Sequence, residues 1–193
     1  MAFDPARGVP TLATGRLRLR PLTEADTDAI FSLYSDPHVT RYLSRPPMST
    51  RADARAAIER AAEEFSAGTA LRVGLARPED NQVIGTGNLL HFDWQCRRAE
   101  VGYALAPPFW GQGLASEATA ALVEYGFETL DLLRLEAELD PRNEASTRVL
   151  ERQGFLKEGL LRERWIVGDE VSDSLLMGLL RSDYRNRAIR STA

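Results

Sequence analysis

Residues 110–113 (WGQG) form a glycine-bearing turn that leads into a helix predicted to begin near Leu114 or Ala115. The first turn of a helix carries backbone N–H groups without partners inside the helix, and the helix dipole adds positive potential there. Because glycines leave those amides uncovered, this spacing predicts a site for a phosphate or pyrophosphate. The turn lacks the lysine of a P-loop, and no GxGxxG follows a strand. The alternative is an ordinary strand–turn–helix connection.

Glu100 is the carboxylate of the strand that precedes this turn, predicted over residues 99–105. Strand side chains alternate between faces, so Glu100 lies on the face opposite Tyr103, beside two small residues that leave space for another group. Partial burial would raise the pKa of Glu100 towards the range of a general base. A solvated or structurally paired carboxylate is the alternative. His91, at the end of the preceding strand, is a second candidate base.

Asn143 and Ser146 form a further polar pair at the start of a helix predicted over residues 144–153. Residues three apart lie on one helix face, and Val149 and Leu150 continue that face, so we expect Ser146 to point inward. Asn143 follows Pro141 and Arg142 and also suits the N-cap position. A purely structural N-cap is therefore the alternative for Asn143.

The elements that must position these residues follow from the hydrophobic periodicity. Strands are expected at residues 16–20, 70–76, 83–92, 97–105, 133–139, 155–167 and 171–180, and helices at about 23–36, 51–67, 114–130 and 144–153. A helix separates the strands at 97–105 and 133–139, so these two should be parallel and joined by a right-handed crossover. The expected class is α+β, with a mixed, mostly antiparallel sheet of about seven strands flanked by about four helices.

Length and composition favour one domain, because 193 residues with 44% hydrophobic content suffice for a single core. We expect that domain at residues 15–185, between an N-terminal lead-in (1–14) and a C-terminal tail (186–193). A net charge of −4 gives no indication of a nucleic-acid partner. With one cysteine and two histidines, neither a disulfide nor a metal site is expected. The sequence has no signal peptide and no apolar run of 18 residues, so we predict a cytoplasmic protein without a membrane partner.

Residues 110–115 (WGQGLA) resemble motif A of the GNAT superfamily, the acyl-CoA-dependent N-acetyltransferases, which reads Q/R-x-x-G-x-G/A. Trp110 departs from the motif, because glutamine or arginine is usual at that position. An aromatic residue followed by glycine is similar to the RimJ/RimL branch, which acetylates protein N-termini. The resemblance covers about residues 17–184, is strongest over residues 100–155, and implies the GNAT fold.

The resemblance implies acetyl-CoA as co-substrate and no metal. It places the pyrophosphate on the turn and the pantetheine arm along the strand end, whose pairing the following Pro107-Pro108 should interrupt. The cofactor-binding residues expected on this basis are Tyr103, Ala104, Leu105, Gly111, Gln112, Gly113, Leu114, Ala115, Ser116 and Asn143. Arg142 and Arg148 could contact the 3′-phosphate, but solvated surface residues are the alternative, so neither is included among the expected cofactor-binding residues.

The resemblance also implies direct attack of an amine on the thioester in a ternary complex. Glu100 would take the proton from the amine, directly or through water, with His91 as the alternative. The family often supplies a tyrosine from the helix at 144–153 to protonate the thiolate, but this helix has none. Residues 143–146 (NEAS) instead resemble the N-x-x-S of the Rim branch. On that basis Ser146 should contact the sulfur and Asn143 the cofactor's arm.

A protein N-terminal amine is the first expectation for the acceptor, because the resemblance is to the Rim branch. Residues 36–43 resemble the family's D-P-x-V-x-x-x-L run, and we expect the loop at 36–47 and the hairpin at 165–172 to shape the acceptor pocket. The candidates are Tyr42, Trp165, Asp169 and Glu170, and the alternative is aromatic packing beside a solvated turn. A small amine, such as a polyamine, an amino acid or an antibiotic, is the alternative acceptor. A non-catalytic acyl-CoA-binding sensor is the alternative function. The family also makes a homodimer plausible.

Overall fold

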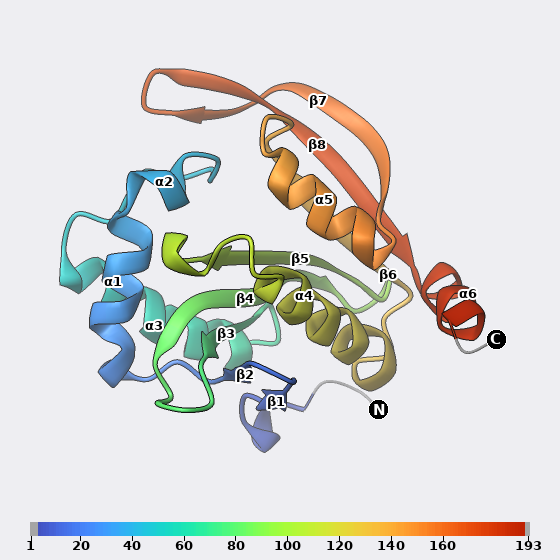
Figure 1. Ribbon diagram of the computed structural model, residues 1–193, viewed down its shortest axis with the longest axis horizontal. Helices are drawn as coiled ribbons and strands as arrows, with labels where there is room; N and C mark the ends of the chain where they lie inside the picture. Colours follow the sequence, from blue (N-terminus) through green and yellow to red (C-terminus); the bar gives the residue numbers. More distant parts are fainter. Residues whose placement is uncertain (1–3, 192–193) are drawn as a thin grey trace.

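One mixed sheet runs through the computed structural model, which describes residues 4–191 (Figure 1). Among these residues the sheet has eight strands in the order β1-β2-β3-β4-β5-β6-β8-β7. The bounds are β1 (Leu12–Ala13), β2 (Arg18–Arg20), β3 (Leu71–Ala76), β4 (Val83–Asp93), β5 (Arg98–Leu105), β6 (Arg134–Leu139), β7 (Leu156–Val167) and β8 (Glu170–Leu180). Neighbouring strands are antiparallel except β5 and β6, which are parallel as predicted. The α+β fold class is confirmed. The one strand that was not predicted is β1, which lies within the predicted lead-in and pairs with β2.

The helices agree with the prediction in the middle of the chain and differ near its ends. Their bounds are α1 (Thr27–Ser35), α2 (Pro37–Thr40), α3 (Arg51–Ser66), α4 (Leu114–Glu124), α5 (Glu144–Gln153) and α6 (Arg181–Ser191), with short turns η1 (Pro5–Arg7), η2 (Glu24–Asp26), η3 (Pro107–Phe109) and the π-helical η4 (Tyr125–Thr129). The helix predicted over 114–130 is therefore α4 followed by a wider turn. The one-turn helix α2 lies within residues 36–48, which the sequence predicted to be a loop or a short helix.

Helix α6 crosses the predicted domain end at residue 185. Its Tyr184 ring packs against the fully buried ring of Phe127, with 5.2 Å between the centroids. This contact gives the first turns of α6 a hydrophobic anchor on the domain. Residues 1–3 of the predicted lead-in and 192–193 of the predicted tail lie outside the described residues.

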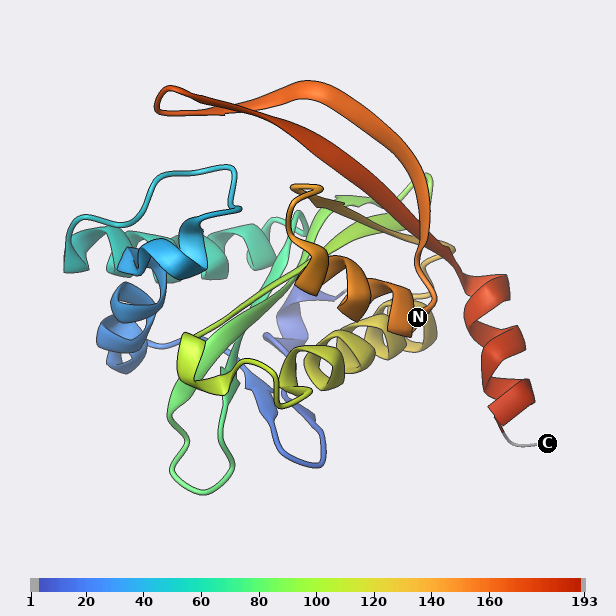
Figure 2. The same cartoon turned by 45° about the horizontal axis from the view of Figure 1, so that its top comes forward.

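The helices cover both faces of the sheet (Figures 1 and 2). Helix α4 packs with the central strands in the larger core, through side chains such as Leu122 and Val101. Helices α1 and α3 pack on the opposite face, through Ile30 and Ile58. No helix in the described part of the chain combines the length and apolarity needed to cross a membrane.

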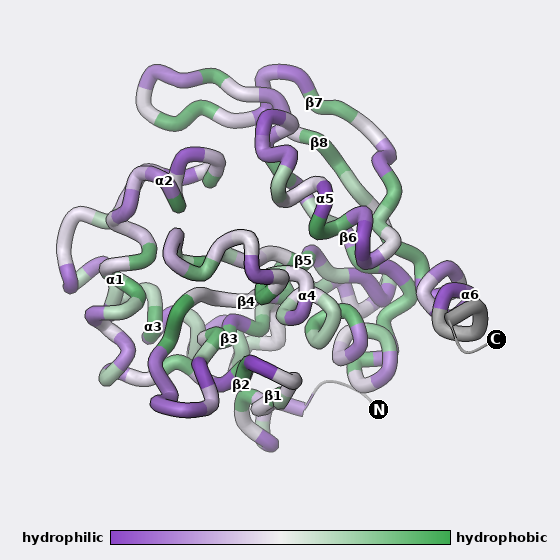
Figure 3. The backbone as a smooth tube through the Cα atoms, in the orientation of Figure 1, coloured by the Kyte–Doolittle hydropathy of each residue, from purple (hydrophilic) through white to green (hydrophobic). Residues whose placement is uncertain are grey.

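Strands β7 and β8 form a long hairpin whose far end reaches beyond the body of the sheet (Figures 1 and 2). Hydrophobic and hydrophilic stretches alternate along it (Figure 3). Its outer residues Ile166 and Val171 are exposed. The hairpin tip and the loop after α2 line the same cavity, so two segments far apart in sequence meet there.

Strands β5 and β6 separate soon after they pair. Their register comprises three partners, ending at Glu100 and Glu136. On its other side β5 remains paired with β4 as far as Leu105. The C-terminal half of β5 therefore has sheet pairing on one side only, and a gap lies between the two parallel strands.

Candidate active site

The backbone of β5 facing this gap comes from alternate residues. Ala106 N donates to Ile84 O at 2.9 Å, which fixes the direction of the neighbouring peptide groups. In an antiparallel pair, alternate residues direct their N–H and C=O groups to the partner strand, so Ala104 faces β4, whereas Tyr103 and Leu105 face the gap. Of the three strand residues predicted to bind the cofactor, Ala104 can therefore offer its methyl group but not its peptide groups to a molecule in the gap.

Trp110 closes the outer end of the gap. Its indole Nε1 donates to Leu105 O at 2.5 Å. The tryptophan that departs from motif A thus occupies the carbonyl at the end of β5. The peptide groups of Tyr103 and the N–H of Leu105 remain directed into the gap.

The turn before α4 has the backbone conformation that its glycines predict. Gly111 and Gly113 have φ of 72° and 79°, in the left-handed region that favours glycine. A Cβ at Gly111 would meet no atom within 4 Å, so the turn is uncovered there. Gly113 is the N-cap of α4, and no side chain caps this helix. Its first amides are therefore available for an anion, as the sequence predicts.

The remaining predicted residues of this turn contribute mainly backbone. Leu114 is buried in the core, and the Ala115 carbonyl accepts from Thr119 Oγ1 at 2.7 Å. Gln112 Nε2 donates to Pro108 O at 2.9 Å, which braces the turn internally. Ser116 Oγ lies 2.8 Å from Gln153 Nε2 of α5, so its hydroxyl links the two helices.

Arg16 and Glu117 hold the turn from the N-terminal side, and neither was predicted to do so from the sequence. Arg16 Nη1 donates to Gln112 O at 2.8 Å, and the Arg16 backbone N–H donates to Glu117 Oε1 at 2.7 Å. Thr14 Oγ1 also donates to Glu117, at 2.6 Å. Although burial opposes ionisation, the hydrogen bonds from Thr14 and Arg16 hold the pKa of Glu117 below its usual range. The carboxylate in the first turn of α4 is thereby kept charged.

Tyr103 and Ser146 meet across the two elements that border the gap. Tyr103 Oη lies 2.9 Å from Ser146 Oγ of α5. Burial raises the pKa of the Tyr103 phenol, and the hydrogen bond to Ser146 partly offsets this. Tyr103 was expected from the sequence only to bind the cofactor, and no local signal indicated that its hydroxyl would reach Ser146. Two hydroxyl groups in contact can pass a proton between them.

Asn143 is the N-cap of α5, since its Oδ1 accepts from Ser146 N at 3.1 Å. Asn143 therefore has the N-cap role that was the structural alternative for this residue. Its side chain also lines the cavity that contains Ser146, so its amide N–H₂ can face a ligand.

Glu100 and His91, the two candidate bases, form a pair. His91 Nδ1 lies 3.0 Å from Glu100 Oε2, and the His91 side chain is 78% exposed whereas that of Glu100 is 24% exposed. Burial raises the pKa of Glu100, while the hydrogen bond and charge of His91 act in the opposite direction. Glu138 and Glu136 add to the rise. The direction agrees with the sequence-based prediction for Glu100.

A cavity of about 1010 Å³ joins these groups. Glu100, Tyr103, Asn143 and Ser146 all line it. The elements predicted to shape the acceptor pocket line it as well, with Tyr42 from the loop after α2, and Trp165 and Glu170 from the hairpin. A carboxylate of raised pKa and a hydroxyl pair thus face one space at the strand gap. Such an arrangement can remove a proton from one reactant and supply one to another.

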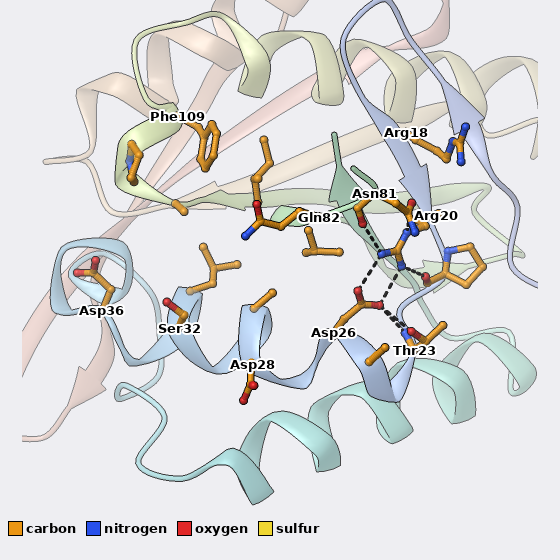
Figure 4. Close-up of a pocket in the computed structure, with 18 of the residues that line it drawn as sticks. Arg18, Arg20, Thr23, Asp26, Asp28, Ser32, Asp36, Asn81, Gln82 and Phe109 are labelled. Carbon is orange, nitrogen blue, oxygen red and sulfur yellow. Dashed lines mark hydrogen bonds and ion pairs between the residues drawn. The ribbon is translucent and has the colours of Figure 1, made fainter. Parts of the chain in front are cut away.

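A second cavity, of about 1210 Å³, lies on the other side of α1 (Figure 4). Arg20 lies at one end of it and donates to Asp26 through two contacts, of 2.8 and 2.9 Å (Figure 4). Despite the opposing effect of burial, hydrogen bonds from Arg20 and Thr23 hold the pKa of Asp26 below its usual range. These charges neutralise one another and hold the start of α1 against β2, which is a structural role.

The splayed parallel strands, the uncapped glycine turn and the α+β sheet agree with what the sequence resemblance to acyl-CoA-dependent acetyltransferases implies. Residues 16–156 match the family model described as Acetyltransferase (GNAT) domain. The chain is 37% identical over 174 residues to the uncharacterized N-acetyltransferase p20 of Bacillus licheniformis, covering 90% of this chain and 98% of that protein. This chain therefore belongs to the GNAT acetyltransferase family.

Two more distant relatives have named acceptors. The [ribosomal protein uS5]-alanine N-acetyltransferase of Escherichia coli is 25% identical over 181 residues, which cover 90% of this chain and 92% of that protein. The structure of spermidine N-acetyltransferase from Vibrio cholerae, in complex with CoA and spermine, superposes with a TM-score of 0.80 at 22% identity. It covers 90% of this chain and 100% of that one. At that identity the match shows the fold alone.

Proposed function

We propose that this protein transfers the acetyl group of acetyl-CoA to a primary amine, and that the acceptor is a protein N-terminal amine. The observation that supports this most directly is the cavity at the strand gap, which Glu100 and the Tyr103–Ser146 pair line together. Acetyl transfer to an amine needs a base for the amine and a proton for the departing thiolate. In this proposal Glu100 is the base, and the Tyr103–Ser146 pair supplies the proton.

The cofactor would lie along the gap between β5 and β6. Its pyrophosphate would accept hydrogen bonds from the amides at residues 111–116, where α4 has no side-chain cap. Its amide-bearing arm would pair with the peptide groups of Tyr103 and Leu105, and Asn143 would add a side-chain contact. Two fixed ends would hold the thioester carbonyl still while the amine approaches.

Glu100 would be the general base. An incoming ammonium group must lose a proton before its nitrogen can attack, and a carboxylate whose pKa is raised by burial accepts it more readily than an ordinary one. His91, exposed at the cavity edge, would then carry the proton from Glu100 to solvent. His91 as the base itself, or a water molecule between Glu100 and the amine, are the alternatives.

The Tyr103–Ser146 pair would protonate the departing thiolate. A serine hydroxyl is a weak acid, but as Ser146 Oγ gives its proton to the sulfur, it can receive one from the Tyr103 phenol at 2.9 Å. Proton and charge then balance, because the phenolate is reprotonated from solvent through the cavity. This assignment supplies a tyrosine for the acid although α5 has none.

The protein N-terminal acceptor is supported by the relative that acts on ribosomal protein uS5 and by the Rim-type motif. A small amine is the second candidate, since a spermidine N(1)-acetyltransferase of Escherichia coli is 24% identical to this chain over 168 residues. A screen of N-terminal peptides, polyamines, amino acids and aminoglycosides, read out as CoA release, tests the proposal. Turnover on peptides above that on small amines supports it. Turnover on small amines alone overturns the acceptor, and tight CoA binding without turnover on any amine favours an acyl-CoA sensor.

A further inference from the structure

We infer that Arg45 binds a carboxylate of the acceptor, so that preferred acceptors carry negative charge close to the reactive amine. This inference rests on the proposed function and deepens it, since it names the chemistry of the substrate. The chemical class is an amine whose molecule also bears a carboxylate, with a peptide carrying Asp or Glu just after its N-terminus as the first form.

Arg45 is held in position although it lies in the loop after α2. Its guanidinium stacks over the ring of Tyr34, with 4.1 Å from its central carbon to the ring centroid. Tyr34 is in turn anchored, because its hydroxyl lies 2.6 Å from Oγ1 of Thr86, a residue only 3% exposed on β4. A stacked guanidinium loses less freedom on binding a ligand than one on a mobile side chain.

Most other arginines that line the cavity are paired with carboxylates. The shortest nitrogen–oxygen distances are 2.6 Å for Arg72 with Glu64, 2.8 Å for Arg98 with Glu136, 2.5 Å for Arg142 with Asp140 and 3.3 Å for Arg164 with Glu138. Arg41 stacks on Tyr42 and acts electrostatically on Asp140. Among the described residues of this lining, Arg41, Arg45 and Arg60 have no carboxylate within ion-pair distance, so their N–H groups are open to a ligand in the cavity. Of these three, Arg45 is the one that stacks on the anchored ring of Tyr34.

The carboxylates of the cavity do not offer a matching site for a second ammonium group. Glu136, Glu138, Asp140 and Glu170 each pair with an arginine, and Glu100 is the proposed base. Seven arginines face five carboxylates in the lining. A polyamine would place additional positive charge among these arginines, whereas a carboxylate would meet the planar fork of Arg45, which binds carboxylates through two parallel hydrogen bonds.

The test compares peptides that share one N-terminal residue and differ in the next two, which are Asp-Glu, Ser-Ser or Lys-Lys. Steady-state CoA release is measured with the unaltered protein and with Arg45→Met and Arg45→Lys. The acidic peptide should have a KM roughly tenfold or more below that of the basic one, the size expected for a hydrogen bond to a charged group. Arg45→Met should remove most of this difference. Arg45→Lys should retain only part of it, since lysine keeps the charge but loses the fork.

Arg162→Met is the matched control, because Arg162 also has no carboxylate partner among the described residues but lies on β7 outside the cavity. It should leave the preference intact. Equal KM values for the three peptides, or an equal effect of the two methionine variants, would overturn the inference while leaving peptide acetylation established. Free aspartate and glutamate form a separate arm. If they alone are acetylated and Arg45→Met abolishes this, the carboxylate site stands and the protein acceptor fails.

Discussion

The phenol oxygen of Tyr103 lies 2.9 Å from the hydroxyl oxygen of Ser146, although the two residues are 43 positions apart in the chain. One comes from a strand that pairs on one side only at this point, and the other from the helix that follows β6. Because the contact borders the gap where the thioester is proposed to lie, it provides the first test of the chemistry.

Tyr103→Phe should lower kcat roughly a hundredfold, the lower end of what a positioned acid contributes, with little change in the KM for acetyl-CoA. Phenylalanine keeps the ring and removes only the hydroxyl. The double variant with Ser146→Ala should be little slower than either single variant, because two residues that act as one unit are not additive. Fully multiplicative losses in single-turnover rates would argue against a shared proton path.

Glu100→Gln should depress the rate at neutral pH and leave CoA affinity nearly unchanged. A base must be deprotonated, so activity should fall as pH drops through the pKa of Glu100, which burial places above the ordinary glutamate range. His91 opposes that rise, so His91→Gln should move the acid limb of the kcat/KM profile to higher pH without abolishing turnover. Loss of all activity in His91→Gln would identify His91 as the base instead.

Gly113→Val should weaken CoA binding at least tenfold by calorimetry. Valine at φ of 79° is strained by about 1–3 kcal/mol, and any relaxation moves the amides that open α4. Gly8→Val controls for strain alone, since Gly8 has φ of 72°, would bring its new Cβ within 4 Å of no other atom, and lies away from the gap. CoA affinity that is equally reduced in both variants would refute a specific role for the turn.

Glu117→Gln should destabilise the protein at pH 7 by roughly 1.5–3 kcal/mol, the range for hydrogen bonds to a charged group. The pKa of Glu117 is lowered on folding, so its contribution is present above the unfolded-state pKa and is lost as pH falls through the folded-state value. The difference in Tm between the two proteins should therefore shrink in acid. Glu144→Gln, which breaks an exposed pair with Arg148, should change stability by less than about 0.5 kcal/mol.

Much of the fold was predictable because local pattern and tertiary requirement agree. Alternating residues predicted β3 to β8 within a few positions, and α5 begins and ends as predicted because its Asn143 cap and Gly154 C-cap are both local signals. The elements missed at the ends have no strong local pattern. Strand β1 forms because its backbone pairs with the edge strand β2, and α6 is held by the packing of Tyr184 on Phe127.

The sequence by itself determined the glycine turn, the parallel crossover and the carboxylate at Glu100, because each depends on residues adjacent in the chain or on strand alternation. Only the tertiary structure decided which side chains meet. The approach of Tyr103 to Ser146, of His91 to Glu100 and of Arg16 to Glu117 depends on how separate elements pack, and the stacking of Arg45 on Tyr34 depends on the path of a loop. The periodicity of a sequence predicts which face of a strand or helix carries a side chain, but not which residues of other elements pack against that face. The contacts between side chains in the site could therefore be identified only from the tertiary structure.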